Sequence, residues 1–129
     1  LPAVDASVSQ YLRRLAYEQL VPTARAGDHL GFAAALHEFG REAGLCFAAE
    51  QGGPYNGPVL TRWVERLREL GAVGIGQSSW GPTLFALSAN AAEAQELVAR
   101  LQQETTDAPL DVDIAAPDNQ GARIWRNWA

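Results

Sequence analysis

A stretch rich in glycine and hydroxyl groups, GIGQSSWGPT at residues 74–83, carries the side chains with the clearest potential for ligand chemistry. A two-residue turn such as Asn-Gly would be enough to join two strands, so this longer loop needs another explanation. Successive backbone N–H groups around Ser78, Ser79 and Gly81, with the two hydroxyls as added donors, would form an anion-binding concavity. The chemistry that this loop would suit is binding of a phosphate.

The same stretch also has a purely structural interpretation. Gln77 offers a bidentate amide, and Trp80 either stacks on a planar ligand or covers the core. Gly74 and Gly76 remove side chains from alternate positions of the preceding strand, which weakens the strand unless another backbone or a ligand approaches closely there. Glycine-rich loops without a fixed spacing to a helix N-terminus are weak signals, so both interpretations stay open.

Two further turns and two histidines are candidates for chemistry. QGGPY at residues 51–55 and the turn around Asn119 are each either a plain turn or a ligand-facing amide. His29 and His37 are eight residues apart, about 12 Å along a helix, so they need a further partner to share a metal ion. No Ser/His/Asp order favours a catalytic triad. The sequence therefore identifies no catalytic residue and no metal ligand.

Composition limits the class of protein. With 129 residues, 47% of them hydrophobic, we expect one domain over residues 1–129, with no membrane span or signal peptide and therefore a cytoplasmic location. The net charge of −5 with interspersed acids and bases argues against nucleic-acid binding. All ten basic residues are arginine, which excludes a Walker A lysine and Schiff-base chemistry. Cys46 is expected to be a packed, reduced thiol.

Periodicity predicts four helices. Ser7 and Gln10 have the spacing of a capping box for a first helix that Pro22 ends or kinks, with one more turn reaching Ala26. Asp28 is the expected N-cap of a second helix. Its inward face would comprise Phe32, Leu36, Phe39, Ala43, Cys46 and Phe47, and its Gly40 and Gly44 would allow close helix packing. The third helix would run from Pro58 to Gly71 with Leu60, Trp63, Val64, Leu67 and Leu70 inward, and the fourth would begin at an Asn90 cap.

Strands are predicted around the hydroxyl-rich loop and near the end of the chain. Residues 72–77 and 83–88 form an expected hairpin, and residues 110–116, LDVDIAA, alternate strictly as a half-buried strand should. The tail, residues 119–128, would add an edge strand or pack its two tryptophans across the sheet. The order predicts an α+β fold with helices packed on one face of a small antiparallel sheet.

Taken together, QGGPY, GAVGIGQSSWGPTLFAL and NQGA resemble the C-terminal half of the GHMP kinase superfamily, and within it most closely the β-ribofuranosylaminobenzene 5′-phosphate synthases of methanopterin biosynthesis. The resemblance implies a ferredoxin-like variant of the α+β fold. It also implies an N-terminal domain that carries the phosphate-cradling loop; the absence of methionine and the start at LPAV agree with a fragment of a longer chain. On this basis the fragment alone is expected to be inactive.

The resemblance further implies a transferase that uses Mg²⁺, bound mainly by the N-terminal domain. It would move a phosphoribosyl group from phosphoribosyl pyrophosphate to 4-aminobenzoate or 4-hydroxybenzoate, releasing carbon dioxide and pyrophosphate. The implied substrate-binding residues are Gly76, Gln77, Ser78, Ser79, Trp80, Gly81, Thr83, Gln51, Gly52, Gly53 and Asn119. By this analogy the serines and loop amides contact phosphate oxygens, Trp80 faces the aromatic acceptor, and Gln77 orients ribose or carboxylate.

Two other functions stay open, as does homodimerisation. The first is an ATP-dependent GHMP small-molecule kinase, against which Trp80 argues because it crowds the close backbone approach that glycines permit. The second is a non-catalytic ligand-binding module, since a fold does not fix a function. The expected partners are the N-terminal domain and a phosphorylated small molecule.

Overall fold

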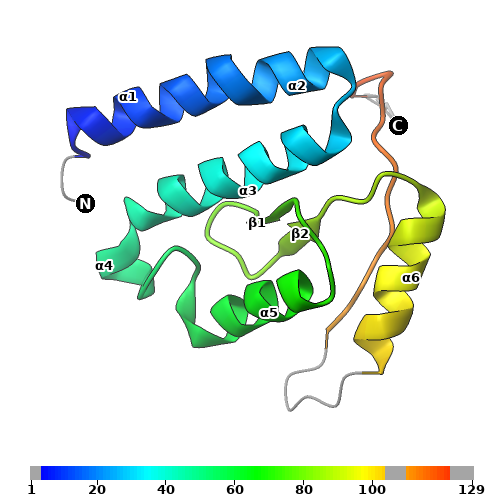
Figure 1. The fold of residues 1–129 in the computed structure, drawn as a ribbon. Helices are drawn as coiled ribbons and strands as arrows, with labels where there is room; N and C mark the ends of the chain where they lie inside the picture. Colours follow the sequence, from blue (N-terminus) through cyan, green and yellow to red (C-terminus); the bar gives the residue numbers. More distant parts are fainter. Residues whose placement is uncertain (1–3, 104–109, 123–129) are drawn as a thin grey trace, which may run out of the picture.

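The computed structural model describes residues 4–103 and 110–122. Its elements are α1 (Ala6–Arg14), the π-helical segment η1 (Leu15–Leu20), α2 (Val21–Ala26), α3 (His29–Leu45), α4 (Ala48–Gln51), α5 (Gly57–Glu69), β1 (Ile75–Gln77), β2 (Leu84–Ala86) and α6 (Ala91–Gln102). The first three follow one another as a single helical rod that runs antiparallel to α3, and the β-hairpin lies between α3 and α5 (Figure 1). The predicted α+β class is confirmed.

The first helix, α1, begins at Ala6, so the residue that caps it precedes the predicted cap Ser7. The Asp5 carboxylate accepts the Ser7 N–H at 2.7 Å, so Asp5 is the N-cap, and the predicted capping box of Ser7 and Gln10 is wrong. Asp5 already supplies the acceptor that the first helical turn needs. Pro22, which has no N–H to donate, lies in the first turn of α2 directly after the wider π-helical turn. The helix then ends at Ala26, as expected.

The second helix, α3, has the predicted cap but a different buried face. Asp28 accepts the Gly31 N–H at 2.9 Å. The buried side chains are Ala33 and Ala35, whereas the predicted inward residues (Phe32, Leu36, Phe39, Ala43, Cys46 and Phe47) are half-buried. The reason is that α3 packs against η1 on one side and β1 on the other, so no single stripe faces a core. The Cys46 thiol is free and half-buried, 3.7 Å from the Glu42 carbonyl oxygen.

The third helix and the hairpin enclose the main core. The helix α5 begins at Gly57, so Pro58 is its second residue and not its first as predicted, and Gly71 follows the helix end with φ 94°, as predicted. In the antiparallel hairpin, Ile75 pairs with Ala86 and Gly76 with Phe85. The two strands are shorter than expected. The core cluster consists of Tyr55, Leu60, Val64, Leu67 and Ile75, and Trp63 is also buried.

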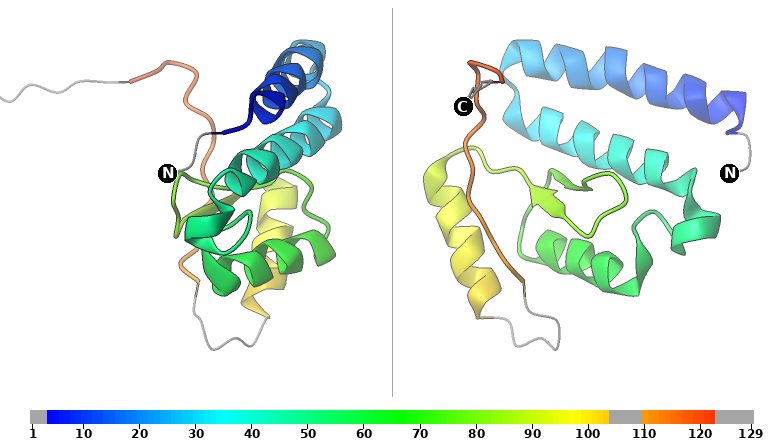
Figure 2. Two further views of the ribbon diagram at one scale, coloured as in Figure 1. Left: turned by 90° about the vertical axis from the view of Figure 1, so that its left-hand side faces the viewer. Right: turned by 180° about the vertical axis from the view of Figure 1, so that it is seen from behind.

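The fourth helix is capped as predicted, but the last predicted strand is wrong. The Asn90 side chain accepts the Glu93 N–H at 3.0 Å, and the Glu93 carboxylate accepts the Ala89 N–H at 3.0 Å. Residues 110–116 form no strand and are exposed throughout. They run past α6 without pairing with the hairpin (Figure 2). Alternating polar and apolar residues indicate that a strand would have one buried and one exposed face. A strand also needs a neighbouring strand to satisfy its backbone hydrogen bonds.

Within the described ranges, no helix has the length and apolarity required to cross a membrane. The predicted tail element falls mostly on residues 123–129, which include both tail tryptophans and lie outside the described residues. Its described part is a turn in which the Asp118 carboxylate accepts the Gln120 N–H at 2.9 Å.

Candidate functional site

The loop from Ser78 to Thr83 is a compact turn that protrudes from the hairpin. The Ser78 N–H donates to the Thr83 carbonyl at 2.9 Å, and the Gly81 N–H donates to the Ser78 carbonyl at 2.9 Å. Ser79 and Gly81 have positive φ values of 53° and 75°, a conformation that glycine adopts freely and serine rarely does. These bonds fix the ends of the loop and leave its tip facing solvent.

The tip presents unused hydrogen-bond donors. Ser78, Ser79 and Trp80 are exposed. Among the described residues, the backbone N–H groups of Ser79 and Trp80 and the hydroxyls of Ser78, Ser79 and Thr83 have no hydrogen-bond partner. Two successive free amides with hydroxyls beside them are a surface that an anion can occupy. Of the amides predicted as anion donors, those of Ser78 and Gly81 are therefore used within the loop, and the free ones are those of Ser79 and Trp80.

A hydrogen-bonded brace of Gln77 and Asn56 holds this tip. The Gln77 carbonyl oxygen Oε1 accepts the Asn56 N–H at 2.7 Å, and Gln77 Nε2 donates to the Ser79 carbonyl at 2.9 Å. Asn56 Nδ2 donates to the Trp80 carbonyl at 2.7 Å. The Gln77 amide is thus engaged at both ends within the chain. Asn56 directly precedes α5 but gives the helix no side-chain cap.

The indole of Trp80 is supported from one side. It meets the Phe47 ring edge-on, with centroids 5.0 Å apart and an interplanar angle of 65°. Trp80 remains 46% exposed, so part of its ring is open to solvent. Edge-to-face pairs of this kind favour a fixed relative orientation. Trp80 is therefore neither a core residue nor a freely moving side chain.

The glycines next to the tip are explained by contacts within the chain. A Cβ at Gly76 would lie 2.4 Å from the Phe85 ring, and one at Gly81 would lie 2.8 Å from Leu60 Cδ1. At Gly74 a Cβ would lie 2.9 Å from the Ala33 Cβ. The close approach predicted along the strand is real, and the chain itself provides it.

The segment Gln51–Gly53 holds the turn that leads to Asn56. Gln51 is only 6% exposed, and its Nε2 donates to the carbonyls of Gly44 and Gly53 at 2.9 and 3.0 Å. Gly52 and Gly53 have φ values of 82° and 151°, so they turn the chain from α4 toward Asn56. In this structure the Gln51 amide positions the turn that carries the brace.

Asn119 lies apart from these residues. The loop between β1 and β2 lies on the α4 side of the molecule, whereas the segment 117–122 lies on the α6 side (Figures 1 and 2). Asn119 belongs to the turn closed by Asp118 and Gln120 and is exposed. The structure therefore joins the segment 47–56 to the hydroxyl-rich loop and leaves Asn119 outside this site.

Neither histidine contributes to the site. His37 Nδ1 lies 2.8 Å from the Ile75 carbonyl oxygen, which ties α3 to the edge of β1. His29 is half-buried at the start of α3. In the part of the chain that the structure describes, no group of three His, Cys, Asp or Glu residues is arranged to hold a metal ion. The site offers hydrogen-bond donors and an aromatic ring, and no general base lies within it.

Sequence reasoning missed Asn56 and Phe47. The sequence around each residue indicates only a helix end or a turn. The partners that define their roles are 21 to 33 residues away along the chain. The single local signal was an asparagine directly before Gly-Pro at a helix start, and that pattern predicts a cap.

Comparison with known proteins gives one family. The model of the family described as GHMP kinases C terminal matches residues 20–107. The search of curated proteins and the search of solved structures gave no match.

Proposed function

The chain belongs to the GHMP kinase C-terminal domain family, and from this premise we propose that it is the C-terminal half of a phosphoribosyl-transferring enzyme. The enzyme would transfer a phosphoribosyl group from phosphoribosyl pyrophosphate to 4-aminobenzoate or 4-hydroxybenzoate, with release of carbon dioxide and pyrophosphate, as a step of methanopterin biosynthesis. The resemblance of GQSSWGPT to the synthases of that pathway is what selects this reaction within the superfamily.

The observation that carries the proposal is the exposed, braced tip of the loop. The free N–H groups of Ser79 and Trp80 and the neighbouring hydroxyls suit the oxygens of a phosphate or pyrophosphate. Donors that are already held in place stabilise developing negative charge without the cost of reorganising at the moment of reaction. Gln77 and Asn56 supply that rigidity through the carbonyls of Ser79 and Trp80.

The aromatic part of the proposal concerns Trp80. In the proposed reaction a ring carbon of the benzoate must be held close to the anomeric carbon of the ribose, because proximity and orientation supply much of the rate acceleration of such two-substrate reactions. The indole of Trp80, oriented by Phe47, is a surface against which a benzoate ring would pack. The proposal gives Gln77 the role of a positioning residue.

The remaining catalytic groups must lie outside the described residues. The resemblance implies Mg²⁺, but the described residues do not fit a Mg²⁺ site, because they contain no cluster of carboxylates that would hold the ion. We assign the metal ligands and any general base to an N-terminal domain, the expected partner in this superfamily. The chain by itself is then expected to bind pyrophosphate and to show no turnover.

Turnover by the full-length protein tests the proposal. With Mg²⁺ and phosphoribosyl pyrophosphate, we expect release of pyrophosphate and carbon dioxide that depends on one of the two benzoates. Release with neither acceptor would reject the synthase. Phosphate transfer from ATP to a small molecule under the same conditions would instead identify a kinase of the same superfamily.

Two variants of that protein connect the reaction to the loop. Trp80→Ala is expected to raise the KM for the benzoate, and Ser79→Ala to weaken binding of phosphoribosyl pyrophosphate. The control is Ser9→Ala, an exposed serine on α1. If both loop variants match the control in turnover and binding, the loop is only structural.

A further inference from the structure

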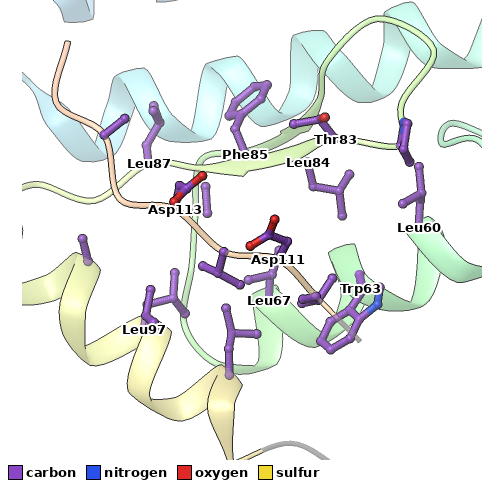
Figure 3. A pocket seen from close by; sticks show the side chains of 18 of the residues that line it. Leu60, Trp63, Leu67, Thr83, Leu84, Phe85, Leu87, Leu97, Asp111 and Asp113 are labelled. Atoms are coloured by element: carbon purple, nitrogen blue, oxygen red, sulfur yellow. The ribbon is translucent and has the colours of Figure 1, made fainter. Parts of the chain in front are cut away.

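A cavity lies between α5, β2, α6 and the segment 110–115, and it shares with the hydroxyl-rich loop only the loop's last residues, Pro82 and Thr83. This cavity has a volume of about 690 Å³ (Figure 3). Its lining includes the buried side chains Leu60, Trp63 and Leu67 of α5 together with Leu97 and Leu101 of α6. Volumes of 300–1,000 Å³ with mostly apolar walls are typical of small-molecule sites.

The lining has few polar side chains, and the ionisable ones among them are all acidic. The polar side chains are Thr83, where the hydroxyl-rich loop ends, and Asp111 and Asp113 on the segment that crosses the cavity (Figure 3). Neither aspartate forms a hydrogen bond or an ion pair with any described residue. Both ionisable groups in the lining are therefore acids to which no described residue supplies a counter-charge.

The basic residue of α6 does not neutralise these carboxylates. Arg100 pairs with Glu96 and donates to the Leu70 carbonyl at 3.2 Å, and it is absent from the lining of the cavity. An apolar cavity with two unpaired carboxylates at its wall disfavours an anion, because a charged group that leaves water needs an opposite charge. The cavity therefore differs chemically from the loop tip, where two free backbone N–H groups are available to an anion.

We propose that this cavity binds a small organic cation, an ammonium group attached to an aromatic or aliphatic body. The body would occupy the space between Trp63, Leu84 and Leu97, and the ammonium would pair with Asp111 and Asp113. This role would explain the exposed acids of the segment 110–115. The segment places two carboxylates next to the apolar lining of the cavity and does not pair as a strand. The inference does not depend on the proposed transferase activity.

Three probes with one apolar body and different head groups test the charge requirement. Isothermal titration of the chain with 4-phenylbutylamine, 4-phenylbutanol and 4-phenylbutyrate should give the order ammonium, then alcohol, then carboxylate. A single exposed ion pair corresponds to at most about a fivefold change in affinity, so with two carboxylates beside the ammonium the amine should bind roughly two- to fivefold more tightly than the alcohol. Equal binding of all three probes, or binding of none of them, would overturn the proposal.

A charge-matched pair of variants locates the contact. Asp111→Asn with Asp113→Asn should remove the preference for the amine over the alcohol while leaving alcohol binding unchanged. The control is Glu18→Gln with Glu65→Gln, two exposed acids outside the cavity, which changes the net charge equally. If both double variants lower amine binding to the same extent, the effect is general electrostatics and the proposed contact is wrong.

A third variant separates this ligand from other occupants of the groove. Ala94→Phe, on the cavity-facing side of α6, should weaken both the amine and the alcohol by filling the space. Thermal unfolding reports whether the variant folds, and sedimentation reports whether the chain is monomeric. A dimer that this variant dissociates, with no probe binding to the unaltered chain, would assign the groove to a second copy and contradict the proposal.

Discussion

Replacing Asn56 by alanine should loosen the hydroxyl-rich loop without unfolding the domain. The substitution removes the 2.7 Å bond from Asn56 Nδ2 to the Trp80 carbonyl but keeps the Asn56 N–H that binds Gln77 Oε1. One hydrogen bond contributes about 1 kcal/mol, which corresponds to a factor of about five in an equilibrium constant. Because this bond joins two exposed segments, the lost free energy should appear in local opening of the loop.

Amide hydrogen exchange measures that opening directly. The N–H groups of Ser78 and Gly81 are bonded within the loop and should exchange about five times faster in Asn56→Ala. The Ile75 amide, in the buried part of β1, should keep its rate. The control is Asn119→Ala, an exposed asparagine in the segment 117–122, which lies on the α6 side of the molecule (Figure 1). Unchanged protection of Ser78 and Gly81 in Asn56→Ala would refute the brace.

Three further substitutions test the packing around this site. Gly44→Ala should lower the free energy of unfolding by about 1–3 kcal/mol, because the new Cβ would lie 2.0 Å from the Pro54 carbonyl oxygen; chemical denaturation measures it. Tyr55→Phe should raise the free energy of unfolding by about 1 kcal/mol, because the buried Tyr55 hydroxyl has no hydrogen-bond partner among the described residues. Trp80→Ala should leave stability within about 1 kcal/mol, because it removes one partly exposed ring contact with Phe47.

The tyrosine prediction has a pH dependence of known sign. Burial raises the pKa of Tyr55 above its ordinary value of 10.0, so the folded state holds the phenol proton more tightly than the unfolded state does. The stabilisation is complete below the unfolded pKa and is lost as the pH rises above about 10. Tyr55→Phe should reduce this alkaline loss. Part of the alkaline loss of stability should persist in this variant, because the hydrogen bond to Glu38 also raises the pKa of Tyr11.

Matched controls keep these results interpretable. Gly40 lies in the same helix as Gly44, but a Cβ there meets no atom within 4 Å, so Gly40→Ala should stabilise by up to about 1 kcal/mol through helix propensity. Tyr17 is 71% exposed, and Tyr17→Phe should leave the unfolding free energy unchanged. A loss of stability in Gly40→Ala equal to that in Gly44→Ala would show that the contact with Pro54 is not the cause.

Local patterns predicted the helix boundaries that depend on local chemistry. Asp28 and Asn90 cap helices because each side chain accepts from the amide three residues ahead. Pro58 and Gly71 bound α5 for equally local reasons. Gly44 was correctly expected to need a small side chain, although the close neighbour is the Pro54 carbonyl of a turn and not a second helix, and Gly40 has no such neighbour.

Features that depend on distant partners were not predictable. Residues 110–116 have the alternation of a strand, but nothing in their own sequence specifies a neighbour with which to pair. The buried face of α3 depends on which elements pack against the helix, and here both η1 and β1 do so. For the candidate site, the sequence predicted donors around Ser78, Ser79 and Gly81, but which amides stay free, and the brace from Asn56, depend on the fold.

The claim on which the account depends is that the loop tip binds phosphate groups. We expect titration of the ¹⁵N-labelled chain with inorganic pyrophosphate to shift the Ser79 and Trp80 amide resonances saturably, and less so in Asn56→Ala. Sodium chloride at equal ionic strength should not reproduce the shifts. Absence of shifts at these two amides, or equal shifts over the whole surface, would contradict the claim.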